Sequence, residues 1–151
     1  MSSSRVRCLF AAGLFALAPT VWAADPVAVS DPYARAVPPG QPNSAVFMTL
    51  TNQSDQARAL VAATSPAAKT VELHTHTNDG GVMRMRRIER IEVPAGGSVQ
   101  LKPGGLHVML IGLTGDLTPG GQVALGLTFD DGSQLQVQAP VRTVATAPAA
   151  H

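Results

Sequence analysis

Histidine and methionine side chains gather in one stretch of this chain. Three of its four histidines and three of its five methionines lie between residues 74 and 109. Ten residues separate His74 from Met85, twenty-one separate Met85 from His107, and Met109 follows two positions later. Neutral imidazole nitrogen and thioether sulfur are ligands that soft, low-charge metal ions prefer, copper(I) above all. The spacing makes these four residues candidate ligands of a copper(I) site.

The candidate ligands argue against other metals. Zinc sites are built from cysteine, histidine and carboxylate, and none of these four side chains is anionic. Calcium and magnesium bind oxygen. The alternative is that each methionine fills a core and each histidine lies in a loop, which is the commoner situation for any single residue. Agreement of chemistry and expected geometry across all four favours a metal site.

A hairpin is expected to bring the first two candidates together. Residues 78–81 read Asn-Asp-Gly-Gly, and Asp-Gly is a favoured pair in a two-residue type I′ turn. With Asp79 and Gly80 as the turn, counting outward sets His74 directly opposite Met85. The two side chains would then lie next to each other on one face of the hairpin.

The other two candidates share a strand face. Side chains of a strand alternate between its faces, so His107 and Met109 point the same way. Val108 and Leu110 then point in the opposite direction, into the core. One pair from a hairpin and one pair from a separate strand could converge on a single ion.

The fold that must position these pairs is predicted to be all-β. Short apolar runs alternate with polar residues, and turn sequences rich in glycine, proline and aspartate separate them. Seven to nine such strands indicate an antiparallel Greek-key barrel or sandwich. The clearest alternating runs are Val46-Met48-Leu50, Val71-Leu73, Val99-Leu101, Val123-Leu125-Leu127 and Leu135-Val137.

The N-terminal 23 residues have the pattern of a cleaved secretory signal. Arg5 and Arg7 precede a short apolar run, and small residues stand at the positions that signal peptidase reads, up to Ala23. We expect a domain over residues 24–142 and a flexible C-terminal tail over 143–151. Cleavage would remove Cys8, the one cysteine, and would leave no thiolate ligand and no cysteine for a lipid anchor. The near-neutral charge of the remainder argues against a nucleic-acid binder.

The His–Met spacing resembles the motif of the PCuAC family of periplasmic copper chaperones without a gap, and the similarity covers roughly residues 28–141. The resemblance implies a cupredoxin-like β-barrel that binds copper(I) through His74, Met85, His107 and Met109. It also implies delivery to an acceptor such as the CuA centre in subunit II of cytochrome c oxidase, often beside a Sco-type thioredoxin-like partner. Further segments that look like the family are Tyr33-Ala34-Arg35-Ala36, Asn43-Ser44-Ala45-Val46, Val71-Glu72-Leu73-His74 and Gly81-Val82-Met83-Arg84-Met85-Arg86.

Two features depart from the common family pattern. Many relatives carry methionine where this chain has His76, and the predicted hairpin sets His76 opposite Met83. These two residues form either an auxiliary metal pair or a solvated neighbour of the site. Some relatives also have a C-terminal tail rich in histidine and methionine that binds copper(II). Here the tail holds only His151, which speaks against a second site there.

Several functions compete for this composition. A periplasmic copper(I) chaperone is the leading hypothesis, and a copper-buffering or resistance protein without a dedicated acceptor shares all its ligands. An electron-transfer cupredoxin needs a cysteine thiolate that the mature chain lacks. A copper oxidase needs an open metal position and substrate contacts, so we expect no enzymatic activity. A β-sandwich that binds no metal is the remaining alternative.

Overall fold

The computed structural model describes residues 26–144, which contain ten strands and no helix. The predicted all-β class is confirmed, with ten strands where seven to nine were expected. The predicted signal peptide over residues 1–23 and residues 145–151 of the predicted tail lie outside the described residues. The strands are β1 Val27–Arg35, β2 Asn43–Asn52, β3 Arg58–Thr64, β4 Ala68–Asp79, β5 Val82–Ile88, β6 Ile91–Val93, β7 Ser98–Leu101, β8 His107–Leu113, β9 Gln122–Phe129 and β10 Gln134–Arg142. Within this range no helix is long and apolar enough to cross a membrane.

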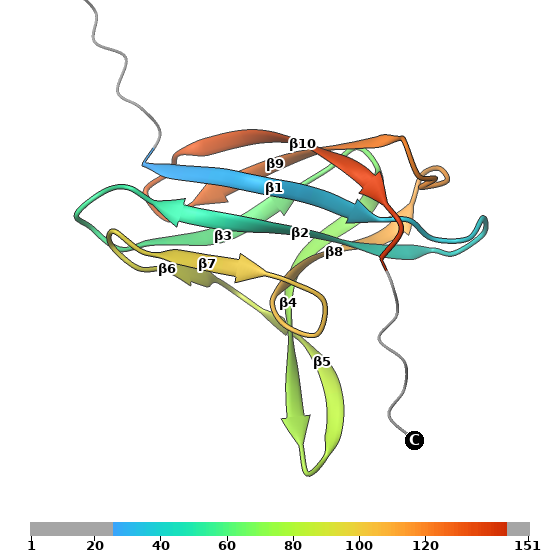
Figure 1. The fold of residues 1–151 in the computed structure, drawn as a ribbon, viewed down its shortest axis with the longest axis horizontal. Helices are drawn as coiled ribbons and strands as arrows, with labels where there is room; N and C mark the ends of the chain where they lie inside the picture. The colour runs from blue at the N-terminus through green and yellow to red at the C-terminus, as the bar shows by residue number, and fades with distance from the viewer. Residues whose placement is uncertain (1–25, 145–151) are drawn as a thin grey trace, which may run out of the picture.

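The strands follow one another in the order β5-β4-β8-β2-β1-β10-β9-β3-β6, and β7 pairs separately with β2. The β1–β10 pair is parallel, whereas the other pairs in the described range are antiparallel. The path does not close on itself, so the molecule is an open, folded-over sheet with a sandwich-like body (Figure 1). One half of the sheet contains β5, β4, β8, β2, β1 and β7, and the other contains β10, β9, β3 and β6. Strands distant in sequence pair within each half, such as β4 with β8 and β9 with β3, so the chain crosses between the halves more than once.

The hydrophobic core lies between the two halves of the sheet and follows the predicted alternation. Val46, Met48 and Leu50 of β2 are fully buried in it, as are Val108 and Leu110 of β8. Because neighbouring residues of a strand face opposite sides, the residues between these core positions point to the outer face of the same sheet. That outer face therefore becomes available for a site without disturbing the core.

The β4–β5 hairpin projects away from the body (Figure 1). The first half of β4 pairs with β8, from Ala68 to His74, whereas its second half pairs with β5 alone. All of β5 except its last residue is exposed. The hairpin therefore has its base in the main sheet and its tip in solvent.

A buried asparagine ties the end of β2 to the opposite half of the sheet. Asn52 is fully buried, and its amide group donates to the carbonyl oxygens of Gln56 (2.7 Å) and Val93 (3.2 Å). Its side-chain oxygen accepts from the backbone N–H (3.0 Å) and the hydroxyl (2.7 Å) of Ser54. A buried polar group is tolerated when its hydrogen bonds are satisfied, as they are here.

Replacing this residue should destabilise the fold. Asn52→Ala removes four hydrogen bonds and leaves the Val93 carbonyl buried without this donor, so we expect the free energy of unfolding to fall by about 2–4 kcal/mol. Urea denaturation followed by circular dichroism measures the change. The exposed neighbour Gln53 serves as control, since Gln53→Ala should shift the free energy by less than about 0.5 kcal/mol. Equal stabilities of the two variants would contradict this role of Asn52.

Candidate metal centre

The turn between β4 and β5 lies one residue later than the sequence predicted. Gly80 and Gly81 form it, with φ of 65° and 89°, and Asp79 pairs with Val82. A type I′ turn needs positive φ at both central positions, which glycine adopts at little cost and aspartate does not. The side-chain oxygen of Asn78 also accepts the N–H of Gly81 at 2.8 Å. Two glycines are thus preferred over Asp-Gly in this loop.

This turn changes which side chains face each other. His76 lies opposite Met85, and His74 lies opposite Arg87. The predicted opposition of His74 to Met85 and of His76 to Met83 is therefore wrong. The partner of each β4 residue moves by two positions, and because side chains repeat every two residues, the face is unchanged. His74, His76, Met83 and Met85 consequently share one face of the hairpin, as expected.

The pairing of β4 with β8 brings the two groups of candidates together. His74 lies directly opposite His107, and Glu72 lies opposite Met109. The rings of His74 and His107 have centroids 5.8 Å apart. Two imidazoles that share one ion have centroids at most about 6 Å apart, since each metal–nitrogen bond is about 2 Å long. The two rings are thus close enough to share an ion.

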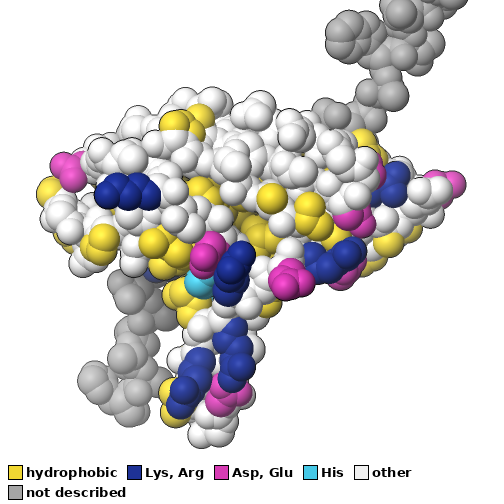
Figure 2. Space-filling view, turned by 180° about the vertical axis from the view of Figure 1, so that it is seen from behind, with side chains coloured by type: hydrophobic (Ala, Val, Ile, Leu, Met, Phe, Trp, Pro, Cys, Tyr) yellow, Lys and Arg dark blue, Asp and Glu magenta, His cyan; other side chains and the backbone are white. Residues whose placement is uncertain are grey.

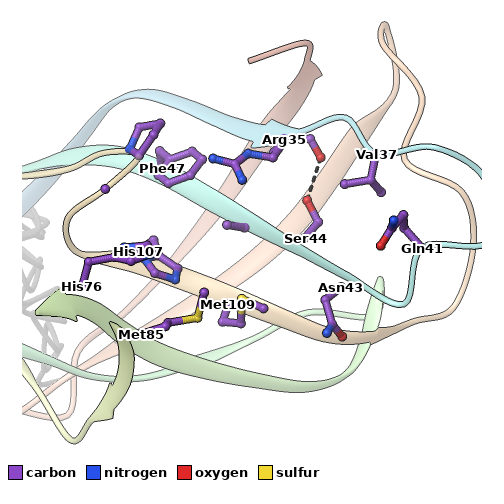
Figure 3. A pocket seen from close by; sticks show the side chains of 13 residues that line it. Arg35, Val37, Gln41, Asn43, Ser44, Phe47, His76, Met85, His107 and Met109 are labelled. Atoms are coloured by element: carbon purple, nitrogen blue, oxygen red, sulfur yellow. Dashed lines mark hydrogen bonds between the residues drawn. The ribbon is translucent and has the colours of Figure 1, made fainter. Parts of the chain in front are cut away.

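A cavity of about 270 Å³ opens on this face of the sheet. His76, Met85, His107 and Met109 lie together along it, so that two imidazoles and two thioethers meet in one place (Figure 3). His74 lies beside the cavity, next to His107, without lining it. Met83 does not line it either, and its side chain is 55% exposed. The remaining lining residues are Arg35, Val37, Gln41, Asn43, Ser44, Ala45, Phe47, Pro103 and Gly104.

His107 is the buried member of the group, with 2% of its surface exposed. Its Nδ1–H donates to the carbonyl oxygen of Gly105 at 3.0 Å, which leaves Nε2 with a free lone pair. Burial lowers the pKa of His107, and the neighbouring His76, His74 and Arg35 lower it further against the opposing effect of the Gly105 hydrogen bond. This environment favours the neutral ring, which is the form that binds metal.

The same carbonyl oxygen orients a second imidazole. Nδ1 of His76 lies 3.4 Å from the oxygen of Gly105, and the rings of His76 and His107 have centroids 5.2 Å apart. With a carbonyl as acceptor, Nδ1 of His76 must be the donor, so its Nε2 is also free. The loop before β8 thus fixes the orientation of two rings, a function that the sequence pattern did not reveal.

An aromatic cluster backs the cavity on the side of β2. The Phe47 ring lies 6.2 Å from that of His107 and 5.3 Å from that of Tyr33, and the Arg35 guanidinium lies 5.5 Å above it. Phe47 is 1% exposed yet belongs to the outer face, not to the main core. The sequence reasoning missed this residue, although its position between the core residues Val46 and Met48 could have signalled a second apolar cluster.

His74 has a different environment. Its Nε2 lies 2.8 Å from a carboxylate oxygen of Glu72, and its Nδ1 is buried without a hydrogen-bond partner. A metal ion is one way to satisfy such a nitrogen. Across residues 26–144, no three histidine, cysteine or carboxylate side chains are grouped so as to hold a metal by themselves. A metal in this cavity would therefore depend on the thioethers of Met85 and Met109.

The other face of the projecting hairpin is basic. Arg84 and Arg86 lie there beside Asp79, at 3.9 Å and 2.9 Å from its carboxylate, and both arginines are more than half exposed. Figure 2 shows basic side chains along this arm. The projecting part of the hairpin thus carries His76 and Met85 on one face and Arg84 and Arg86 on the other.

Comparison with known proteins agrees with this architecture. A family model described as "Putative lipoprotein LpqE-like" matches residues 27–141. A protein of Leifsonia xyli subsp. xyli that is named as a putative lipoprotein is 35% identical over 120 residues, which is 79% of this chain and 71% of the relative.

Two solved structures have the same fold. Copper(I)-bound DR1885 of Deinococcus radiodurans superposes with a TM-score of 0.61 at 40% identity, covering 76% of this chain and 78% of that one. The copper-bound PCuAC domain of PmoF2 superposes with a TM-score of 0.67 at 22% identity, covering 82% and 97%. The predicted resemblance to PCuAC proteins is confirmed, and the chain belongs to the LpqE-like family, whose fold is that of the PCuAC domain.

Proposed function

We propose that this protein binds copper(I) at the cavity between β4, β5 and β8 and delivers it to an acceptor protein, without catalysing a reaction. The main observation behind the proposal is that two thioethers and two imidazoles line one cavity on the outer face of the sheet. Such neutral, soft ligands favour copper(I) over zinc, calcium and copper(II). The similarity to copper(I)-bound DR1885 supports the same choice of metal.

The proposed ligands are His74, Met85, His107 and Met109, with His76 as an auxiliary group. His107 and Met109 come from the rigid sheet, and His107 already presents a free Nε2. His74 has a buried nitrogen without a partner next to that ring. His76 lines the cavity opposite Met85, which suits a ligand that assists entry or exit of the ion.

Release of the ion is proposed to begin at Met85. This side chain is 45% exposed on the projecting hairpin, whereas His107 is 2% exposed. An incoming ligand from an acceptor can therefore replace the exposed thioether first, while the buried imidazole still holds the ion. Because all the proposed ligands are neutral, replacing one of them with a neutral acceptor ligand leaves the total charge of the site unchanged. Stepwise exchange of this kind is what a chaperone requires.

The proposed location is the periplasm, with cleavage of the signal sequence after Ala23. The charged start and short apolar run of residues 1–23 support export, as does the lipoprotein name of the Leifsonia xyli relative. The proposed acceptor is the CuA site of cytochrome c oxidase subunit II, and the proposed intermediate carrier is a Sco-type thioredoxin-like protein. The arginines of the hairpin suit docking on an acidic surface of such a partner.

Copper(I) titration tests the site directly. Purified protein lacking residues 1–23 should bind one equivalent of copper(I) in competition with a chromophoric copper(I) chelator. Met85→Leu and His107→Ala should each lower the affinity by at least about 10-fold, because each removes one ligand. Met83→Leu is the matched control on the same hairpin face and should leave the affinity unchanged. Full affinity in both ligand variants would refute the assignment.

The two β4 histidines should differ in their contributions. His74→Ala is expected to lower copper(I) affinity at least about 10-fold more than His76→Ala, since we assign the primary ligand to position 74. The same chelator competition measures both variants, with protein folding checked by circular dichroism. A larger loss for His76→Ala would make the cavity-lining ring the ligand and reverse this assignment.

A transfer assay separates a chaperone from a copper buffer. Copper(I)-loaded protein mixed with the copper-free soluble CuA domain should lose its metal to that domain within minutes. Met85→Leu tests the proposed exit route, because it removes the exposed thioether that an acceptor ligand would displace. Copper that stays on the wild-type protein despite a tighter-binding acceptor would favour the buffering function.

A further inference from the structure

Glu72 is well placed to control how His74 binds the ion. Building on the copper(I) site proposed above, we propose that Glu72 is a positioning residue that fixes the proton of His74 on Nε2, so that His74 binds copper through Nδ1. His107 and His76 would instead bind through Nε2. Nothing in the spacing of the motif distinguishes these two modes of binding.

The contact between Glu72 and His74 is short and sheltered. Oε2 of Glu72 lies 2.8 Å from Nε2 of His74, and the two side chains are 23% and 13% exposed. The other carboxylate oxygen lies 3.9 Å from Nε of Arg87, which pairs directly with His74 across the hairpin. Glu72 is thus held between a ring and a guanidinium on one face of the sheet. This arrangement restricts the direction from which the carboxylate meets the ring.

The hydrogen-bonding chemistry places the proton. An ionised carboxylate can only accept, so Nε2 of His74 must donate. Nδ1 of the same ring is buried and has no acceptor near it. A proton on Nδ1 would be a buried donor without a partner, which costs free energy. Of the two neutral forms of the ring, the one with hydrogen on Nε2 and a lone pair on Nδ1 is therefore favoured.

The neighbouring rings have the opposite arrangement. His107 and His76 both direct Nδ1 at the carbonyl oxygen of Gly105, at 3.0 Å and 3.4 Å. A carbonyl accepts, so the lone pair of each of these rings is on Nε2. Metal-binding histidines commonly donate their second ring N–H to a carboxylate or a carbonyl, which fixes the ring and strengthens it as a ligand. Glu72 has this function for His74, and the carbonyl of Gly105 has it for His76 and His107.

Nitrogen-15 NMR of the copper-free protein tests the proton positions without any metal. We expect His74 to show hydrogen on Nε2 and none on Nδ1, and His107 to show the reverse. His107 is an internal reference, because its partner is a backbone carbonyl that no Glu72 variant alters. Hydrogen on Nδ1 of His74 in the wild-type protein would overturn the inference. Copper(I) titration of the same sample tests the proposed function, so the two can fail separately.

Variants at Glu72 test whether the carboxylate matters for binding. Glu72→Leu cannot accept a hydrogen bond, and we expect a loss of 10- to 100-fold in copper(I) affinity. The Nε2–H signal of His74 should also move or exchange faster with water in the copper(I) complex, while that of His107 stays in place. Glu72→Gln keeps an acceptor oxygen, so its loss should be smaller than that of Glu72→Leu.

An exposed glutamate provides the control. Glu89→Leu makes the same change of charge and size outside the site and should leave both the affinity and the His74 signals unchanged. Unaltered His74 signals together with unaltered affinity in Glu72→Leu would refute a positioning role. A spectrum of His74 that shows copper bound at Nε2 in the wild-type protein would refute the assignment of Nδ1.

Discussion

The pairing of β4 with β8 is the constraint on which the candidate metal centre depends. It sets His74 opposite His107, and through the period of two it keeps Glu72 and Met109 on the same outer face. The same alternation sends Leu73, Val108 and Leu110 into the core. Burial of these apolar side chains therefore holds the register that brings the imidazoles together. A slip of one residue would exchange the core and site faces of the strand.

The candidate site combines a buried imidazole in the sheet with an exposed thioether on a hairpin, and both groups are neutral ligands. His107 is buried, hydrogen-bonded to Gly105 and backed by Phe47, whereas Met85 is presented from a hairpin that extends into solvent. A preorganised imidazole reduces the cost of ordering the site when the ion binds. An exposed thioether with three rotatable bonds adapts to the ion and to a partner's ligands. In the proposed function, binding and release of the ion therefore depend on different elements of the fold.

The sequence was sufficient to predict the fold class and most of the neighbourhood of the site. Alternation in β2, β4 and β8 predicted which residues enter the core, and the His–Met spacing pointed to a hairpin and a strand that lie together at one cavity. The register of the hairpin could not be predicted, because Asp79-Gly80 and Gly80-Gly81 are both acceptable turn pairs and the choice depends on the cost of positive φ at Asp79.

The groups that orient the rings also escaped the sequence analysis. Gly105 acts through its backbone carbonyl, which no side-chain pattern encodes, and Glu72 becomes relevant only once its contact with His74 is seen. The alternation in β2 separates Phe47 from Val46 and Met48, but the sequence does not show that its ring lies next to Tyr33 and Arg35. That His76 lies opposite Met85, and not opposite Met83, follows from the position of the turn.

X-ray absorption spectroscopy of the copper(I)-loaded protein tests the central claim most directly, because it reports the elements bound to the ion. The account predicts a copper(I) edge with both sulfur and imidazole nitrogen in the first coordination sphere, and loss of one sulfur contribution in Met109→Leu. A first sphere that contains nitrogen and oxygen alone would contradict a site formed by thioethers and imidazoles on this face of the sheet.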